Sequence, residues 1–177
     1  MPGLVIPVFA LVTPSFNQGH YLESTLRSVL DQGYSQLHYQ VIDGTSTDGS
    51  IAILERFRPR LQGLIIEPDE GQYHAIHKGF QQALAESDAE IMGWLNSDDL
   101  LLPGALQTVA EVFASFPEVE WISCLVRARC SHDGRIDAIT TLPGLSRQAF
   151  LHNRYLPAAD PFSSFGFIQQ EIGRAHV

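Results

Sequence analysis

Cysteine is nearly absent from this chain: its 177 residues include only Cys124 and Cys130, too few for a disulfide-stabilised scaffold of this length. Both lie on or beside an expected strand, so we expect inert thiols buried in the core. Long apolar runs are also missing, since none approaches the roughly 20 residues of a membrane-spanning helix. The apolar start, residues 4–12, has no cationic segment before it and contains Pro7, unlike a signal peptide. These absences predict a cytoplasmic protein.

Positive charge is scarce, because 11 lysines and arginines stand against 20 aspartates and glutamates, for a net charge of −9. This balance argues against non-specific nucleic-acid binding and against a polybasic membrane patch. A phosphate-bearing ligand would need a metal ion, helix termini or a few local cations. Two nucleotide-binding motifs are missing as well: there is no Gly-x4-Gly-Lys-Ser/Thr, and no Gly-x-Gly-x-x-Gly follows the first expected strand. Kinase-like and dinucleotide-dependent chemistry therefore lose their main support.

What the chain does contain is a regular alternation of short apolar runs and helical patterns, within a length typical of one domain. Strands are expected at residues 8–13 (ended by Pro14), 37–42, 64–67 and 91–95. Helices are expected between them and again from Pro103, with Leu84 on the inner side of the third helix. This order predicts an α/β fold with a mostly parallel sheet flanked by helices. Beyond it, expected strands at 120–129 and 136–141 flank Asp133-Gly134, which predicts a C-terminal antiparallel hairpin. A short helix at 146–152, a loop at 157–164 and a last strand at 165–169 complete the expected order.

The run that ends the fourth expected strand, Asn96-Ser97-Asp98-Asp99, carries two adjacent carboxylates. Inside a strand they would lose hydration without a partner, whereas at the carboxyl end of a strand they face the crevice where α/β sheets bind ligands. Two carboxylates and an amide form a hard oxygen set that suits Mg²⁺ or Mn²⁺. The alternative is a turn that caps the helix expected to begin near Pro103.

Polar clusters also follow the other three expected strands, at residues 13–17, 43–50 and 68–73. In a parallel sheet all four clusters lie on one edge, which favours a ligand crevice there. Asp43 can accept hydrogen bonds from a base or a ribose, while Gly44 allows a close backbone approach. The alternative for Asp43 is a helix cap, although Asp48 is better placed for that role.

These four motifs carry a resemblance. The ordered series Thr-Pro-Ser-Phe-Asn, Ile-Asp-Gly-x-Ser-Thr-Asp-Gly, Glu-Pro-Asp-x-Gly-Gln-Tyr-x-Ala-Ile-x-Lys-Gly and Trp-Leu-Asn-Ser-Asp-Asp resembles family 2 glycosyltransferases with the GT-A fold. It spans about residues 8–170, and the later segments resemble bacterial members that build cell-surface polysaccharides. The resemblance implies an inverting transfer of a sugar from a nucleotide-sugar donor to a glycan or lipid-linked acceptor. It also implies Mg²⁺ or Mn²⁺ on the diphosphate, and peripheral contact with the inner face of the membrane where the acceptor is lipid-linked.

Carried over by position, the resemblance implies a role for each matching residue. Asp98 would touch ribose or metal, and Asp99 would coordinate the metal. Gln169 and Gln170 would lie near the acceptor. The nucleotide would lie between two walls formed by Thr13, Ser15 and Asp43 and by Asp69, Gly71 and Lys78.

The chain departs from the family pattern at three positions. His74 and His77 stand where the family commonly has Asp and Asn; they form either a metal-binding pair at i, i+3 spacing or, by the second interpretation, polar groups at the rim. Thr45 replaces a usual glycine, which matters only if that residue needs a positive φ.

The last residues, 171–177, do not continue the family pattern, and their reverse translation resembles a sequencing adapter read in frame. We expect a single GT-A-like domain over residues 1–170, incomplete at its C-terminus, followed by a non-native tail. In the family the catalytic base lies after the Gln-Gln segment, so the base is not assigned and transfer is expected to be weak or absent. Two alternatives remain: an inactive nucleotide-sugar-binding fragment, and a nucleotidyltransferase, which usually shows a Gly-rich, basic loop after its first strand.

Overall fold

The computed structural model describes residues 6–124, 126–131, 135–141 and 171–174. They fall into two compact units, Met1–Ile122 with Glu171–Val177, and Ser123–Gln170. The helix, loop and strand expected at 146–152, 157–164 and 165–169 lie outside the described residues, as do Gln169 and Gln170.

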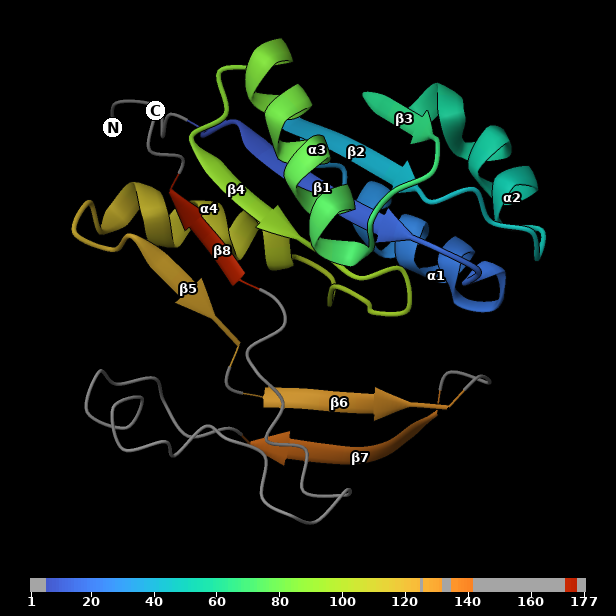
Figure 1. The fold of residues 1–177 in the computed structure, drawn as a ribbon. Coiled ribbons are helices and arrows are strands. Elements are labelled where there is room, and N and C mark those ends of the chain that lie inside the picture. The colour runs from blue at the N-terminus through green and yellow to red at the C-terminus, as the bar shows by residue number, and fades with distance from the viewer. Residues whose placement is uncertain (1–5, 125, 132–134, 142–170, 175–177) are drawn as a thin grey trace, which may run out of the picture. The chain divides into compact units, whose positions relative to one another are not determined.

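The first unit is built on a sheet with the strand order β3-β2-β1-β4-β8-β5 (Figure 1). Four of its strands are mutually parallel, β1 (Phe9–Ser15), β2 (Leu37–Asp43), β3 (Gly63–Ile66) and β4 (Ile91–Trp94). This arrangement confirms the predicted mostly parallel α/β sheet. The C-terminal ends of β1 to β4 therefore lie along the same side of the sheet. We call this row of strand ends the carboxyl edge.

Two short strands extend the sheet beyond β4. β8 (Glu171–Arg174) pairs antiparallel with β4, and β5 (Trp121–Ser123) lies next to it in the strand order. β8 belongs to residues 171–177, the segment expected from the sequence to be a non-native tail. Because ladder hydrogen bonds join backbone groups, an open sheet edge accepts extended segments of many sequences. The origin of this tail stays a prediction.

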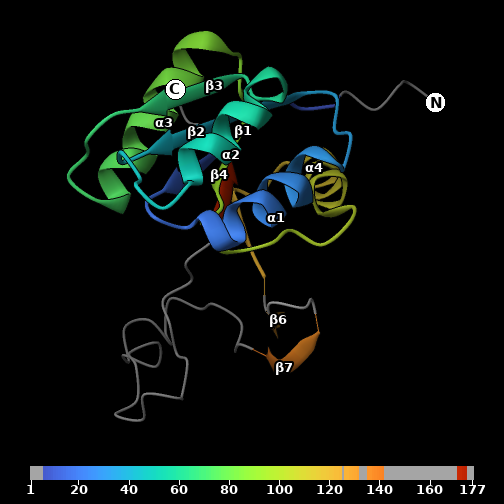
Figure 2. The same ribbon diagram turned by 90° about the vertical axis from the view of Figure 1, so that its right-hand side faces the viewer.

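Helices cover both faces of the sheet. α1 (Gly19–Leu30), α2 (Ser50–Phe57, followed by the short 3₁₀ helix Arg58–Arg60) and α4 (Ala105–Ser115) lie on one face, and α3 (Gln72–Glu86) lies on the other (Figures 1 and 2). Alternate residues of β1 enter the two cores: Phe9 and Leu11 pack with α1 and α4, whereas Val12 packs with Ala75 of α3. Such a central strand, buried on both faces, explains the unbroken apolar run in the sequence.

Three predicted boundaries or orientations are wrong. β1 continues through Pro14 to Ser15, because its pairing with β4 stops at Val12 and leaves one side of Pro14 without a ladder partner. α4 begins at Ala105 rather than at Pro103, after Gly104 in a left-handed conformation (φ 80°). Leu84 is 38% exposed, since the inner stripe of α3 runs through Ala75, Ile76, Gly79 and Ala83.

The second unit contains β6 (Val126–Cys130) and β7 (Ile136–Thr141), which pair antiparallel and confirm the predicted hairpin. The single strand predicted over 120–129 is instead two strands, β5 and β6. The prediction of buried thiols is also wrong, because Cys124 and Cys130 are both exposed and free. Cys130 lies in a two-stranded ribbon, which by itself does not form a core. Throughout the described ranges, no helix combines the length and the apolar character needed to cross a membrane.

Candidate functional site

A buried hydrogen-bonded cluster lies where β1 and β2 end. Ser15 and Asp43 are register partners, and the Ser15 hydroxyl donates to Asp43 Oδ2 at 2.8 Å. The Ser46 hydroxyl donates to the same oxygen at 2.8 Å, and the Ser46 amide donates to Oδ1 at 2.7 Å. Asp43 is fully buried, so these three bonds replace the hydration that its carboxylate loses. The carboxylate thus fixes the turn that follows β2.

The loops after β1, β2 and β3 meet through backbone contacts. The Gly44 amide donates to the Ser15 carbonyl at 2.9 Å, and the Glu67 amide donates to the Asp43 carbonyl at 3.0 Å. A Cβ atom added to Gly44 would lie only 2.9 Å from Asp69 Oδ2 and 3.2 Å from the Phe16 ring. A larger residue at position 44 would force the Asp69 carboxylate or the Phe16 ring to shift, which accounts for Gly44 in the Asp-Gly pair.

The first two loops are also joined by Asn17 and the segment after Gly44. The side-chain oxygen of Asn17 (Oδ1) accepts a hydrogen bond from the backbone amide of Thr47 at 2.8 Å. The backbone amide of Asn17 donates to Ser46 Oγ, also at 2.8 Å. Asn17 and Thr45 both have positive φ, 54° and 67°. Position 45 therefore does require the left-handed conformation, and a β-branched residue there is strained. The departure from the family's usual glycine has a structural consequence.

The fourth loop, residues 96–99, which we call the carboxylate loop, is joined to the start of α3. Gln72 Nε2 donates to Asn96 Oδ1 at 2.5 Å, and Asn96 Nδ2 donates to Asp99 Oδ2 at 2.9 Å. Asp98 is exposed and Asp99 is half-buried. The strand order 3-2-1-4 reverses between β1 and β4, so this loop lies beside the switch point of the sheet, where α/β proteins bind ligands.

The carboxylate loop has the donor chemistry of the predicted metal site. Asp98, Asp99 and Asn96 supply hard oxygen atoms, and Mg²⁺ takes one or two carboxylates while keeping several waters. No group of three or more His, Cys, Asp and Glu side chains gathers within the described ranges. A fully protein-made cage is thus not found there, whereas a two-carboxylate site that shares its metal with a diphosphate fits the residues present.

Thr13 lies beneath this edge rather than on it. It is fully buried, and its hydroxyl is hydrogen-bonded to the hydroxyl of Tyr39 at 2.8 Å. Burial raises the pKa of the Tyr39 phenol far above its ordinary value, so the pair is neutral. The Thr13 side chain therefore supports the carboxyl edge from within the core.

Asp69, Gly71 and Lys78 belong to the loop after β3 and to α3. Asp69 Oδ1 accepts a hydrogen bond from the Gly71 amide at 2.7 Å. Gly71 adopts a positive φ of 108° at this turn before α3. Lys78 Nζ forms an ion pair with Glu67 Oε1 at 2.6 Å, and its side chain is 21% exposed. Lys78 is the only lysine in the sequence. Its ion pair with Glu67 limits how far its ammonium group can reach.

The two histidines of α3 differ in environment. The Glu70 amide donates to His74 Nδ1 at 3.0 Å, so His74 supports the turn that leads into α3. His77 is exposed. The two interpretations from the sequence are a metal-binding pair and polar groups at the rim. The hydrogen bond from Glu70 shows that Nδ1 of His74 stabilises the local turn.

Sequence reasoning missed three residues at the carboxyl edge. Phe16 is 59% exposed beside Gly44, and Tyr73 is 82% exposed at the start of α3. Large exposed aromatic faces suit stacking on a planar ring such as a base. Gln72 donates a hydrogen bond to Asn96, a contact that its place in the third motif does not reveal. All three stand in the motifs that follow the strands, and this position could have identified them. Phe16 and Tyr73 are aromatic, so a search for polar and charged groups passes over them.

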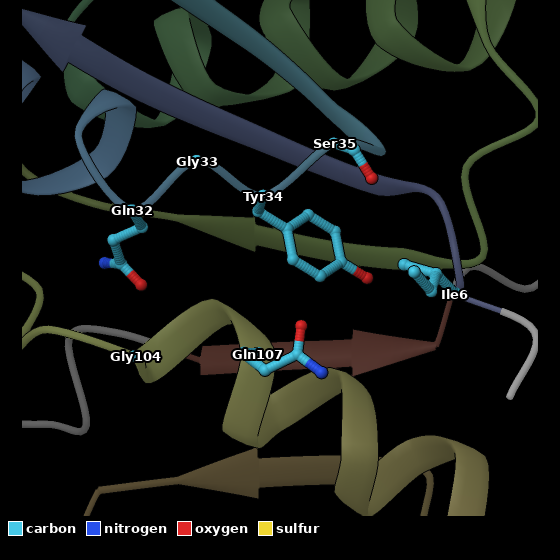
Figure 3. A pocket seen from close by; sticks show the side chains of 7 residues that line it. All are labelled: Ile6, Gln32, Gly33, Tyr34, Ser35, Gly104 and Gln107. Carbon is cyan, nitrogen blue, oxygen red and sulfur yellow. The ribbon is translucent and has the colours of Figure 1, made fainter.

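A separate hollow of about 260 Å³ lies at the opposite end of the sheet (Figure 3). It is lined by Ile6, residues 32–35 after α1, Gly104 and Gln107 of α4. None of the predicted site residues lines it, so it is distinct from the carboxyl edge.

The strand order and the flanking helices together define a GT-A-like α/β domain, with its candidate ligand site at the ends of the parallel strands. The sequence profile described as Glycosyl transferase family 2 matches residues 10–172, and the chain belongs to this family. Among solved structures, a mannosyltransferase of Pyrobaculum calidifontis, PcManGT, in complex with GDP-Man and Mn²⁺ is 28% identical, with a TM-score of 0.55 over 68% of this chain and 36% of that chain. Residues 1–349 of Staphylococcus aureus TarS, in complex with UDP-GlcNAc, share the fold, with a TM-score of 0.55, 22% identity and coverage of 72% and 36%.

Two curated relatives are similar in sequence. TuaG of Bacillus subtilis, which is named for teichuronic acid biosynthesis, is 32% identical over 52% of this chain and 36% of its own length. A PGL/p-HBAD biosynthesis glycosyltransferase of Mycobacterium bovis is 30% identical over 66% of this chain and 44% of its own length. The chain thus spans less than half the length of either relative.

Proposed function

We propose that this chain binds a nucleotide sugar as part of an inverting, metal-dependent glycosyltransferase that acts on a glycan or a lipid-linked acceptor. The proposal depends most on the hydrogen bonds from Gln72 to Asn96 and from Asn96 to Asp99, which connect the start of α3 to the carboxylate loop. A site at a sheet's switch point, with oxygen ligands on one side, suits a nucleoside diphosphate and a divalent cation. The complex of PcManGT with GDP-Man and Mn²⁺ supports the same assignment.

In this proposal Asp98 and Asp99 would hold Mg²⁺ or Mn²⁺. When bound, the cation neutralises charge that develops on the departing nucleoside diphosphate. Lys78 adds positive charge to the wall formed by Asp69 and Gly71, and Glu67 limits how far its ammonium group can move.

Ser15 and Asp43 act from beneath the nucleotide. Their buried bonds hold the Gly44 peptide and the turn at Ser46, against which a base or ribose can lie. Thr13 holds the strand below through Tyr39. Phe16, exposed at the same place, offers a stacking surface for the base. Gln169 and Gln170 are proposed on the acceptor side, and no residue is assigned as the catalytic base.

The setting of the protein belongs to the same proposal. Polysaccharide assembly from a nucleotide-sugar donor indicates the cytoplasm, with peripheral contact at the inner face of the membrane for a lipid-linked acceptor. The relatives named for teichuronic acid and PGL/p-HBAD biosynthesis support such acceptors.

Thermal shift measurements test the proposal. The full chain is heated with UDP, GDP, dTDP and CDP sugars, each with and without Mn²⁺. We expect at least one donor to raise the melting temperature in a metal-dependent way. Asp99→Ala should abolish that shift with little loss of stability, because a half-buried loop carboxylate contributes little to packing.

Asp88→Ala is the matched control, since Asp88 is an exposed carboxylate in the turn before β4, at the opposite end of the strand from the carboxylate loop. It should leave the shift intact. The proposal is wrong if no donor stabilises the chain with metal, or if Asp88→Ala and Asp99→Ala act alike. Donor hydrolysis would favour the transferase, and binding without hydrolysis would favour the inactive fragment.

A further inference from the structure

The carboxylate loop is held from one side by helix α1. After residue 96 the chain runs along α1 toward α4, and three side chains bond its backbone. The Thr25 hydroxyl donates to the Ser97 carbonyl at 2.8 Å. The Leu101 amide donates to Ser28 Oγ at 3.1 Å. The Leu106 amide donates to Gln32 Oε1, also at 3.1 Å, where residue 32 and the start of α4 face each other (Figure 3).

These three polar residues form one stripe, because Thr25 and Ser28 are three positions apart and Gln32 follows four positions later, just beyond the end of α1. They are also linked to one another. The Ser28 hydroxyl donates to the Thr25 carbonyl at 2.8 Å, and Gln32 Nε2 donates to the Ser28 carbonyl at 2.8 Å. Both side chains thus use donor and acceptor groups at once, which fixes their rotamers.

The bond from Thr25 is the one nearest to the carboxylates. Thr25 is fully buried and Ser97 is 4% exposed, so water does not compete for this bond. The carbonyl that it fixes belongs to the peptide between Ser97 and Asp98. The backbone from which Asp98 and Asp99 project is therefore anchored to α1.

We infer that Thr25 is a positioning residue for the cation and diphosphate, acting through the Ser97 carbonyl on Asp98 and Asp99. The inference rests on the proposed function, because it concerns the same site. A metal ligand must be held within a fraction of an ångström, and since Asp98 is exposed and Asp99 is only half-buried, packing of these two side chains does not provide this. Bonds from the rigid helix supply it, while Ser28 and Gln32 hold the rest of the segment in place.

The test compares metal affinity with stability in four forms of the full chain. Thr25→Val keeps the shape of the side chain but removes the hydroxyl, and Thr25→Ser restores the hydroxyl. Tyr34→Phe is the matched control, since the Tyr34 hydroxyl also donates to a backbone carbonyl, that of Pro7, at 2.7 Å, next to the hollow at the other end of the sheet. Mn²⁺ binding is followed by the electron paramagnetic resonance signal of the free ion, with saturating UDP and separately with saturating GDP, and stability by urea unfolding.

We expect Thr25→Val to weaken Mn²⁺ binding about tenfold, as loss of a supporting partner does in metal sites. Thr25→Ser should bind within about twofold of the unsubstituted chain, and Tyr34→Phe should bind normally even where urea shows a similar loss of stability. Normal binding by Thr25→Val, or equal weakening in Tyr34→Phe, would overturn the inference and leave the proposed function standing. If the unsubstituted chain binds no Mn²⁺ with either nucleotide, the inference and the metal part of the proposed function both fail.

Discussion

The hydroxyl of Ser15 donates a 2.8 Å hydrogen bond to Oδ2 of Asp43, its register partner on the neighbouring strand, and both side chains are buried. The pair lies at the end of β1 and β2, where the loops that carry the motifs begin. A buried carboxylate with three hydrogen-bond donors is costly to alter, because each donor would lose its partner in a place that water does not reach.

Asp43→Asn should therefore destabilise the protein by about 1–3 kcal/mol. Asparagine has one acceptor oxygen and one NH₂ donor, so either the backbone amide of Ser46 faces a donor, or the hydroxyls of Ser15 and Ser46 lose the oxygen to which they donate. Urea unfolding measures the difference. Asp88→Asn, the same change at an exposed position, should stay within about 0.5 kcal/mol of the unsubstituted chain. Equal stability of the two variants would contradict the role given to Asp43.

Thr45→Gly should stabilise the protein by about 0.5–1 kcal/mol, because glycine relieves the strain at a φ of 67° and this gain exceeds its extra chain entropy. Thermal and urea unfolding both report the change. Thr47→Gly is the control: Thr47 is exposed two residues later and its φ is not positive, so glycine there should cost about 0.5–1 kcal/mol. We expect opposite changes in the free energy of unfolding for the two variants. A loss of stability in Thr45→Gly as large as that in Thr47→Gly would show that strain at Thr45 is negligible.

Gly79→Ala should destabilise the protein by about 1–3 kcal/mol, although alanine normally favours a helix over glycine. A Cβ atom at this position of α3 would lie 2.5 Å from one Val12 methyl and 2.9 Å from the other. Val12→Ala removes these methyl groups, so in a double-mutant cycle the two substitutions together should cost less than their sum. Additive losses in urea unfolding would show that α3 does not press on β1 here.

Asp48→Asn should reduce the acid dependence of stability. Hydrogen bonds from the Ser50 hydroxyl and the Gly19 amide hold the pKa of the Asp48 carboxyl below its ordinary value. A lowered folded-state pKa contributes stability that is present above the unfolded value and is lost as the pH falls through the folded value. The stability difference between the unsubstituted chain and the variant should thus be constant above about pH 5 and shrink below about pH 4.

The size of this effect is small, because Asp48 is exposed and solvent screens it. Urea midpoints across this pH range, with Asp88→Asn measured alongside to subtract the general effect of one lost charge, provide the test. A stability difference that does not change with pH would contradict it.

Much of the fold followed from local patterns. Apolar runs of strand length, the inward stripe of Leu22, Leu26 and Val29, and Asp133-Gly134 between two strands were enough to predict the parallel sheet and the antiparallel hairpin. The polar clusters at the strand ends were predictable for the same reason, since parallel strands must end on one edge. These features depend on residues within a few positions of one another.

The sequence by itself determined the order of strands and helices and the chemistry placed after each strand. Only the tertiary structure decided that Asp43 is buried beneath its loop, that Thr45 needs a positive φ, that the two cysteines are exposed, and that Thr25 holds Ser97. The physical reason is distance along the chain. Thr25 and Ser97 are 72 positions apart, and a hydrogen bond between a hydroxyl and a carbonyl leaves no periodic pattern in the sequence between them.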